Sequence, residues 1–151
     1  MMALLVTVLK LTRYAAKGAP GEEVRSARFL AGLGMEGDFH AQAGERQLSF
    51  LSTAERRWMG AQAEQGLCFG RYKENILFEA ELSFAPAPGT KIAVGEVVLE
   101  ICGSGKKCFV GCPLFDRGQA CILAGRSLFA KVIRGGLVCA GDCAKVEARA
   151  F

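Results

Sequence analysis

Short apolar runs rich in β-branched and aromatic residues, separated by glycines, dominate the hydrophobic pattern of this chain. Such a pattern favours a β-barrel or β-sandwich over alternating strands and helices. The predicted strands are Ala3 to Lys10, Arg25 to Leu30, Gln47 to Leu51, Asn75 to Phe78, Lys91 to Val94, Val97 to Cys102, Ser127 to Ile133 and Leu137 to Val146. We therefore expect an all-β to α+β fold built on a β-barrel.

Two glycine-containing turns are predicted between neighbouring strands. Gly135 and Gly136 separate the last two predicted strands, and a glycine pair tolerates the positive φ angles of a tight hairpin turn. Gly95-Glu96 gives a similar signal between two apolar runs. Both positions are predicted to be hairpins.

The helical signal is confined to a few short segments. Ser52-Thr53-Ala54-Glu55 is a capping-box pattern, in which the serine and the glutamate satisfy free backbone N–H groups. The predicted helix begins there, ends at Gly66 and turns Trp58 and Ala61 toward the core. Pro113 could open a further short helix. The expected fold therefore has one or a few short helices.

The length of 151 residues fits one domain, covering residues 1–151, with a core that needs no disulfide or structural metal. No apolar run approaches the roughly 18 to 20 residues that a membrane span needs. The run from Ala3 to Leu9 has no basic segment before it and is followed by Lys10, so we interpret it as a strand. We expect a cytoplasmic protein, in which the seven cysteines are thiols or metal ligands rather than disulfides.

The net charge of +4 arises from 19 basic and 15 acidic residues and favours an anionic ligand only mildly. Nucleic-acid-binding domains usually gather Lys and Arg in one patch. Here the basic residues are scattered singly or in pairs. We therefore expect neither a nucleic-acid partner nor a membrane partner.

The first candidate for chemistry is Cys108, which directly follows Lys106 and Lys107. A nearby cation lowers the pKa of a thiol, and the thiolate is the form that attacks sulfur or binds a metal. Glycines at 103, 105 and 111 let backbone N–H groups approach an anion. The alternative is an ordinary loop with a solvated lysine pair.

A structural zinc site is a rival interpretation of the cysteines. Structural zinc sites use closely spaced ligand pairs, and Cys108 with Cys112 and Cys139 with Cys143 have three residues between the members of each pair. No C-x2-C pair is present. Free cysteines often behave as small buried hydrophobes, and this is the default interpretation of four of the seven cysteines. These are Cys68, Cys102, Cys121 and Cys139, so zinc is not favoured.

Two further clusters contain polar residues of ligand-binding type. The segment from Gly34 to Ala41 holds the only histidine, His40, with Asp38 two residues away, and Arg46 follows. Asp38 could orient His40 or cap the turn after Gly37. Arg46 could hold a phosphate in a bidentate fork or form a surface salt bridge. Each cluster leaves both alternatives open.

The second of these clusters is Gly70-Arg71-Tyr72-Lys73-Glu74-Asn75-Ile76. Asn75 lies at the start of a predicted strand, where its amide could donate to a ligand. Asparagine also begins strands simply as a turn residue. Taken alone, the cluster does not decide between these roles.

Six segments in this order resemble the MOSC domain, the fold named for the C-terminal domain of molybdenum cofactor sulfurases. The matching segments are Gly34-x-x-Gly37-Asp38-x-His40-Ala41, Arg46-Gln47-x-Ser49, Glu74-Asn75-Ile76, Ile92-x-x-Gly95-x-x-x-Leu99-Glu100, Lys107-Cys108 and Val132-Ile133-x-Gly135-Gly136-x-Val138-x-x-Gly141-Asp142. The resemblance runs from about residue 30 to 146. It implies a barrel of the MOSC type, similar to the pyruvate kinase barrel, and a pterin cofactor of molybdenum.

By motif position, the resemblance implies that Cys108 is the key cysteine, which carries sulfur as a persulfide or binds molybdenum through its thiolate. Both uses need a deprotonated sulfur, which Lys106 and Lys107 would stabilise. Cations and amide donors of the pocket would suit a phosphate and the pterin edge. The implied cofactor-binding residues are His40, Arg46, Arg71, Lys73, Asn75, Lys106 and Lys107.

The resemblance is greatest to compact MOSC proteins associated with molybdopterin biosynthesis. In those proteins a histidine often follows the key cysteine, whereas Phe109 stands there in this chain. The implied function is binding of molybdenum cofactor or sulfur transfer to it, with a PLP-dependent cysteine desulfurase or a molybdoenzyme as partner. The alternative is a molybdenum-dependent reductase of N-hydroxylated compounds. Enzymatic activity would accordingly be sulfurtransferase-like or oxidoreductase, and no oligomeric state is predicted.

Overall fold

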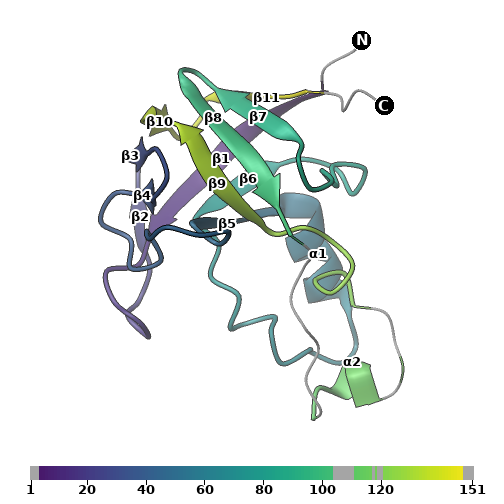
Figure 1. Cartoon of the computed structure of the whole chain (residues 1–151). Coiled ribbons are helices and arrows are strands. Elements are labelled where there is room, and N and C mark those ends of the chain that lie inside the picture. The colour runs from purple at the N-terminus through teal and green to yellow at the C-terminus, as the bar shows by residue number, and fades with distance from the viewer. Residues whose placement is uncertain (1–3, 104–110, 117, 119–120, 148–151) are drawn as a thin grey trace.

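The computed structural model describes residues 4–103, 111–116, 118 and 121–147, and in this part of the chain seven strands close into a barrel (Figure 1). The sheet order is β11-β7-β8-β9-β5-β6-β1, and β1 pairs with β11 to close the ring. The parallel pair is β5 with β6, and the other neighbours around the ring are antiparallel. The bounds are β1 Leu4–Arg13, β5 Leu48–Ser52, β6 Ile76–Glu79, β7 Lys91–Val94, β8 Val97–Cys102, β9 Phe129–Arg134 and β11 Cys143–Val146. The expectation of a β-barrel with few helices is confirmed.

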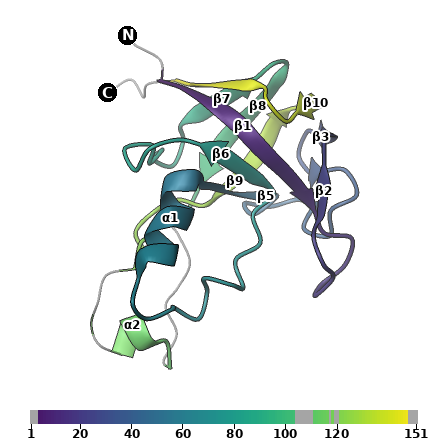
Figure 2. The ribbon, with the colours of Figure 1, turned by 180° about the vertical axis from the view of Figure 1, so that it is seen from behind.

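Four shorter strands complete the described fold at one side of the barrel. Strand β2 (Glu22–Val24) pairs with the end of β1. A separate three-stranded sheet has the order β10-β3-β4, with bounds Gly136–Cys139, Ser26–Leu30 and Gly34–Met35. Figure 2 shows β2 and β3 on the side of the barrel away from the first helix. The sequence pattern did not predict β2 and β4, which have three and two residues.

The interior of the barrel is filled by alternating apolar side chains. On β1, Val6 and Val8 point inward, and the inward position then shifts to Leu11. The shift coincides with a break in register against β6 between Val8 and Lys10, where a β-bulge adds one residue. Each fully buried large side chain of this kind contributes roughly 1.5 to 3 kcal/mol to stability. The bulge thus keeps both halves of a ten-residue strand facing one core.

Helix α1 (Thr53–Ala61) lies outside the barrel and begins as the sequence predicts. Ser52 is the N-cap, its hydroxyl accepts from the Glu55 backbone, and the Glu55 carboxylate accepts from the Ser52 backbone at 2.8 Å. The helix ends at Ala61 and not at Gly66. Its buried residues are Ala54, Glu55 and Met59. Trp58 is half-buried and packs against buried apolar residues, as predicted, whereas Ala61 is exposed, so the prediction was wrong for Ala61.

A second apolar cluster fills the space between the barrel and the helices. It includes Leu51 of β5, Met59 of α1 and Cys112, and Pro113 opens the short helix α2 (Pro113–Asp116). None of the described helices has the length and apolarity that crossing a lipid bilayer requires. The cluster secures α1 against the barrel end that carries the candidate site.

The two predicted hairpins have different outcomes. The turn at Gly95 is confirmed, with φ +59° and Val94 paired with Val97. The hairpin at Gly135 and Gly136 was wrong, because β10 pairs with β3 instead of β9. Gly135 is needed for another reason: a Cβ there would lie 2.6 Å from the Phe29 carbonyl oxygen. The chain passes too close to β3 for any larger residue.

The last predicted strand, Leu137 to Val146, is divided in the structure. A turn after Cys139 separates β10 from β11, and Asp142 Oδ2 accepts from the Cys139 backbone at 2.8 Å. Gly141 adopts φ +97° within this turn. The turn allows the chain to leave the small sheet and close the barrel.

Candidate functional site

A cavity of about 580 Å³, within the size range of small-molecule sites, opens where strands β5 and β9 meet the loops that follow β1 and β4 and precede β6. Loops that are far apart in the sequence converge on it. Its lining residues are Tyr14, Ala16, Lys17, Gly18, Ala19, Phe39, His40, Arg46, Leu48, Ser49, Gly70, Arg71, Tyr72, Lys73 and Phe129. We call this cavity the cationic pocket.

The name reflects the charge of the lining, which includes Lys17, Arg46, Arg71 and Lys73 and, among the described residues, no carboxylate. All four side chains are exposed to solvent. Within the described ranges none of them lies within ion-pair distance of an Asp or Glu. Four cations without counter-charges create a positive potential at the mouth of a cavity, which attracts an anionic ligand.

The fold brings these cations together from three segments. Lys17 lies between β1 and β2, Arg46 lies two residues before β5 begins, and Arg71 and Lys73 precede β6. Of the cofactor-binding residues expected from sequence, His40, Arg46, Arg71 and Lys73 all line the pocket. Lys17 was missed, because a lysine between Ala16 and Gly18 in a loop of small residues carries no distinguishing signal.

Aromatic rings form part of the same wall. The Arg46 guanidinium carbon lies 4.5 Å from the centre of the Phe129 ring, a cation–π geometry that orders a side chain otherwise exposed to solvent. The Phe39 and His40 ring centres are 3.7 Å apart, with their planes inclined at 39°. Flat faces and guanidinium planes suit a planar heterocycle as well as a phosphate.

His40 is held by Asp38, which is buried at 6% exposure. The Asp38 carboxylate receives the His40 backbone N–H at 3.0 Å and lies 3.1 Å from the His40 Nδ1. It also receives the Tyr14 backbone N–H at 2.8 Å. Burial alone raises the pKa of the Asp38 carboxyl, but the hydrogen bonds from His40 and Tyr14 outweigh it and leave that pKa lowered. Both sequence alternatives for Asp38 hold, since it orients His40 and binds the turn backbone.

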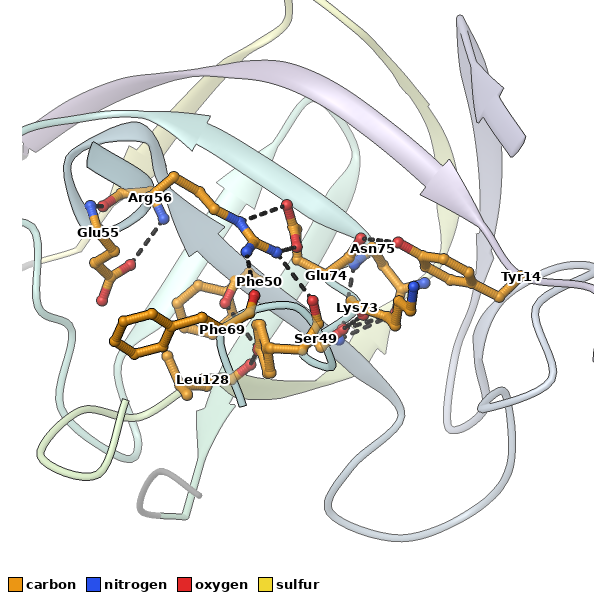
Figure 3. Close-up of polar contacts among 12 residues, drawn as sticks. Tyr14, Ser49, Phe50, Glu55, Arg56, Phe69, Lys73, Glu74, Asn75 and Leu128 are labelled. Atoms are coloured by element: carbon orange, nitrogen blue, oxygen red, sulfur yellow. Dashed lines mark hydrogen bonds and ion pairs between the residues drawn. The ribbon is translucent and has the colours of Figure 1, made fainter. Parts of the chain in front are cut away.

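Asn75 lies beneath the pocket, at 1% exposure, and is not among the lining residues (Figure 3). Its Nδ2 donates to the Thr12 carbonyl at 3.1 Å and to Asp38 Oδ1 at 3.0 Å. Its Oδ1 accepts from the Ser49 backbone at 3.1 Å. The amide is therefore engaged on both sides and supports Asp38 and β5 from below.

Arg56 of α1 fixes the loop that carries Arg71 and Lys73 (Figure 3). Its guanidinium donates to the Phe69 carbonyl at 2.9 Å and to the Tyr72 carbonyl at 2.9 Å, the two residues on either side of Gly70-Arg71. It also forms a bidentate pair with the buried Glu74 carboxylate. Arg56 thus holds the backbone on both sides of Arg71, the residue that lines the pocket.

The Tyr72 hydroxyl secures the same loop from within the core, where it is hydrogen-bonded to the backbone carbonyls of Phe50 and Leu128. Those carbonyl oxygens lie 2.9 and 2.8 Å from it. Burial, followed by the nearby Glu74 and Glu55 carboxylates, raises the pKa of Tyr72 well above its ordinary value. Tyr72 therefore stays neutral and acts as a structural donor.

Cys108, Lys106 and Lys107 lie outside the described residues, so their predicted roles stay predictions. The last described residues before them are Cys102, which pairs with Phe129 of the pocket wall, and Gly103, whose carbonyl accepts from the Ser127 hydroxyl at 2.5 Å. Burial, and then the hydrogen bond and charge of Glu45, raise the pKa of the Cys102 thiol to about 11. Cys102 is thus a protonated, inert neighbour at neutral pH.

The three described cysteines of the alternative zinc set do not come together. Cys112 belongs to the second apolar cluster and precedes α2, whereas Cys139 ends β10 and Cys143 begins β11. Figures 1 and 2 both place α2 at the opposite end of the molecule from β10 and β11. No group of three or more potential metal ligands occurs among the residues that the structure covers. A zinc ion bound by all three would need a different arrangement, since Zn–S bonds are about 2.3 Å.

The sequence matches no protein-family model and no curated protein. Several solved structures resemble the fold. The YuaD protein from Bacillus subtilis has a TM-score of 0.71 and 18% identity, with 99% of each chain covered. YiiM from Escherichia coli has a TM-score of 0.57 and 18% identity, covering 99% of this chain and 72% of YiiM. A hypothetical protein has a TM-score of 0.66 and 16% identity, covering 97% of this chain and 70% of its own.

YuaD and YiiM are MOSC proteins, and the chain described here has a MOSC-like fold. At these identities the likeness concerns the fold. It agrees with the fold that the order of motifs in the sequence implies. The chemistry of this particular chain has to be argued from its own pocket.

Proposed function

We propose that the chain binds molybdenum cofactor, a phosphorylated pterin, in the cationic pocket and carries sulfur to it or holds it through Cys108. The observation that carries this proposal is the convergence of Lys17, Arg46, Arg71 and Lys73 on one cavity without a lining carboxylate. Such a lining attracts anionic ligands, and it attracts a multiply charged anion more strongly than a singly charged or neutral ligand. A phosphate group is the part of the cofactor that this charge selects.

The residues present fit a phosphorylated heterocycle. Arg46 and Arg71 offer planar forks that hold phosphate oxygens in pairs, and Lys17 and Lys73 add point charges. The Arg46 guanidinium, ordered over the Phe129 ring at 4.5 Å, offers a flat face, and the Phe39 ring offers apolar surface, for a planar ring system. A cavity of about 580 Å³ has room for both parts of such a ligand.

Cys108 is proposed as the sulfur-bearing residue on the basis of its sequence neighbours. Two adjacent lysines favour the thiolate, which is the form that accepts sulfur or binds a metal. When bound, the cofactor would supply a metal centre that accepts a sulfur ligand. Cysteine desulfurase is the proposed source of that sulfur, and reduction of N-hydroxylated compounds stays the alternative prediction.

Reconstitution of the purified chain tests the binding proposal. The protein is incubated with molybdopterin cofactor and desalted, and its pterin, phosphate and molybdenum contents are measured. The proposal expects about one pterin and one phosphate per chain. A protein that elutes without pterin, while a known cofactor-binding protein in the same preparation retains it, contradicts the proposal.

Mass spectrometry tests the role of Cys108 separately. After exposure to a cysteine desulfurase and cysteine, peptide mapping is expected to show one added sulfur atom on Cys108. The Cys108→Ser variant should remain unmodified and still bind the cofactor phosphate. Sulfur found on Cys143, which is exposed, with Cys108 unmodified, contradicts the assignment.

A further inference from the structure

Four groups lie within hydrogen-bond distance of the Asp38 carboxylate. Oδ1 accepts from the Tyr14 backbone at 2.8 Å and from Asn75 Nδ2 at 3.0 Å, and Oδ2 accepts from the His40 backbone at 3.0 Å. The fourth group, His40 Nδ1, lies 3.1 Å from Oδ2. A proton on Oδ1 would leave the Tyr14 or Asn75 N–H without an acceptor. Burial alone raises the pKa of Asp38, but the hydrogen bonds around it leave that pKa lowered, so that Oδ2 is not protonated at neutral pH either. Asp38 is therefore an ionised carboxylate, which accepts only.

An ionised Asp38 fixes the tautomer of His40. Because the carboxylate cannot donate, the hydrogen bond to Nδ1 needs the proton on Nδ1, and the neutral ring then has its lone pair on Nε2. Asn75 enforces the same result, since its amide occupies Oδ1 and leaves Oδ2 for the histidine. Within the described part of the chain, no group is hydrogen-bonded to Nε2.

The Nε2 lone pair of His40 can accept a hydrogen bond, which the charged side chains of the cationic pocket cannot. The charged lining side chains, Lys17, Arg46, Arg71 and Lys73, can only donate. The hydroxyls of Ser49 and Tyr72 already bond to backbone carbonyls, at 2.8 Å and 2.9 Å. Neutral His40 is thus the nitrogen acceptor among the described lining side chains, and its side chain is 38% exposed.

We infer that His40 selects ligands that combine an anionic group with an N–H donor, and that it does so by accepting that hydrogen through Nε2. The inference rests on the proposed function for the anion and adds the second recognition element. A phosphorylated amino-heterocycle satisfies both requirements, because the cations take the phosphate and Nε2 takes a ring or exocyclic N–H. A phosphate attached to a plain hydrocarbon satisfies only the first.

The tautomer is measured directly by long-range ¹H–¹⁵N NMR spectroscopy of the free protein. The chain has one histidine, so the imidazole signals need no assignment. Spectra are recorded at rising pH until the signals stop moving, which defines the neutral ring. We expect a protonated Nδ1 and an unprotonated Nε2 in that limit. A neutral ring with its proton mainly on Nε2 overturns the inference without any variant.

Asp38→Asn provides a matched test of the cause. The donors Tyr14 N–H and Asn75 Nδ2 would hold the new amide oxygen and turn its NH₂ group toward His40. His40 Nδ1 would then have to accept, so the tautomer is expected to reverse. Glu36→Gln removes an exposed carboxylate two residues away and should leave the tautomer unchanged. Equal spectra for Asp38→Asn and the wild type contradict the proposal that Asp38 fixes the tautomer of His40.

Two phosphates of similar size test the selectivity. The probes are 6-hydroxymethylpterin phosphate, which carries N–H donors, and naphthalen-2-ylmethyl phosphate, which carries none. We expect the wild type to bind the pterin about fivefold more tightly than the naphthyl compound, as one net hydrogen bond allows. His40→Leu should lose this preference, and His40→Gln, whose amide oxygen accepts, should retain part of it.

The experiments distinguish a failure of the proposed function from a failure of the inference about His40. If neither phosphate binds, the proposed function fails and the ligand half of the inference fails with it, while the NMR result still decides the tautomer. If both phosphates bind the wild type equally, the cationic pocket stands and the role of His40 is overturned. A preference that survives in His40→Leu overturns it in the same way.

Discussion

The Arg56 guanidinium and the Glu74 carboxylate form a bidentate pair between α1 and the loop that enters β6, with Arg56 Nε 3.3 Å from Glu74 Oε1. Arg56 also holds the carbonyls of Phe69 and Tyr72. The pair therefore connects the stability of the helix interface to the position of Arg71, which lies between those two residues. A substitution of Arg56 should therefore affect both the stability of the helix interface and the position of Arg71.

Arg56→Met is expected to lower the free energy of unfolding by about 3 kcal/mol, because it leaves the buried Glu74 carboxylate without its partner. It should also weaken binding of inorganic phosphate to the pocket, because the loop loses its attachment. Urea unfolding and isothermal titration measure the two effects. Arg57→Met, at the exposed neighbouring position of the same helix, is the control and should change neither quantity.

Asn75→Asp replaces a donor to Asp38 by a second buried carboxylate. The pKa of the new carboxyl would be raised in the folded state, since burial and Asp38 both oppose its charge. The new carboxyl group therefore contributes stability below the ordinary Asp pKa of about 3.9, and this contribution is lost as the pH rises through the raised folded-state pKa. The wild-type Asp38, with a lowered pKa, changes stability in the opposite direction.

The expected result is a variant that loses about 3 kcal/mol or more between acid and neutral pH, relative to Asn75→Ala. Urea unfolding at a series of pH values measures the difference. Asn75→Ala removes the amide without adding a charge, so the stability that this variant loses should hardly depend on pH. A pH-independent difference between the two variants would show that Asn75 and Asp38 are not coupled as described.

Glu55→Gln tests the buried capping box. Burial, which outweighs the hydrogen bonds from Ser52 and the charge of Arg126, raises the pKa of the Glu55 carboxyl. The contribution of Glu55 is therefore greatest below its ordinary pKa and falls as pH rises through the raised value. Glutamine keeps the acceptor for the Ser52 N–H without the charge.

The stability of Glu55→Gln relative to the wild type should increase as pH rises from about 4 to 7. Thermal unfolding at several pH values follows this difference. Glu81→Gln, at an exposed position, should show no such trend. A relative stability of Glu55→Gln that falls over the same interval would contradict the described burial.

Cysteine reactivity separates the inert thiols from the exposed ones. With its pKa near 11, Cys102 has about one thiolate in a thousand molecules at pH 8. Cys143 is exposed at the start of β11. Iodoacetamide labelling followed by peptide mapping should modify Cys143 well before Cys102. Early labelling of Cys102 would contradict its burial.

The sequence pattern predicted most of the barrel because strand alternation and turn chemistry act locally. Val94-Gly95-Glu96-Val97 forms its hairpin within four residues, and Ser52 and Glu55 make a cap within one helical turn. The bounds of β7 and β8 were predicted without error. Local physics was sufficient for these elements.

Long-range pairing explains the elements that were mispredicted. Gly136 begins a strand that pairs with Phe29, more than 100 residues earlier, and no local pattern distinguishes this from a hairpin. Likewise, Glu55 was not expected to be buried, because its partner Arg126 lies 3.6 Å away on a distant loop. Tertiary contacts decided both cases.

The residues of the candidate site also fall into two groups, those that the sequence predicted and those that only the fold reveals. His40, Arg46, Arg71 and Lys73 were identified through motif order and lie around one cavity, whereas Lys17 had no motif. Asn75 was expected to bind the cofactor, and the structure places it under the pocket, where it bonds to Asp38. Sequence order predicted four residues that line the cavity, and only the fold shows which side chains face it.

The central claim is that pocket charge binds a phosphorylated pterin, and the dissociation constant of molybdopterin for charge variants tests it most directly. Arg71→Gln combined with Lys73→Gln removes two exposed lining cations, and Lys145→Gln removes an exposed cation of β11 that is not among the lining residues. We predict that the double variant binds about ten- to a hundredfold more weakly, in line with charge-assisted hydrogen bonds, and that the control is unchanged. Equal affinity of the wild type and the double variant would contradict the account.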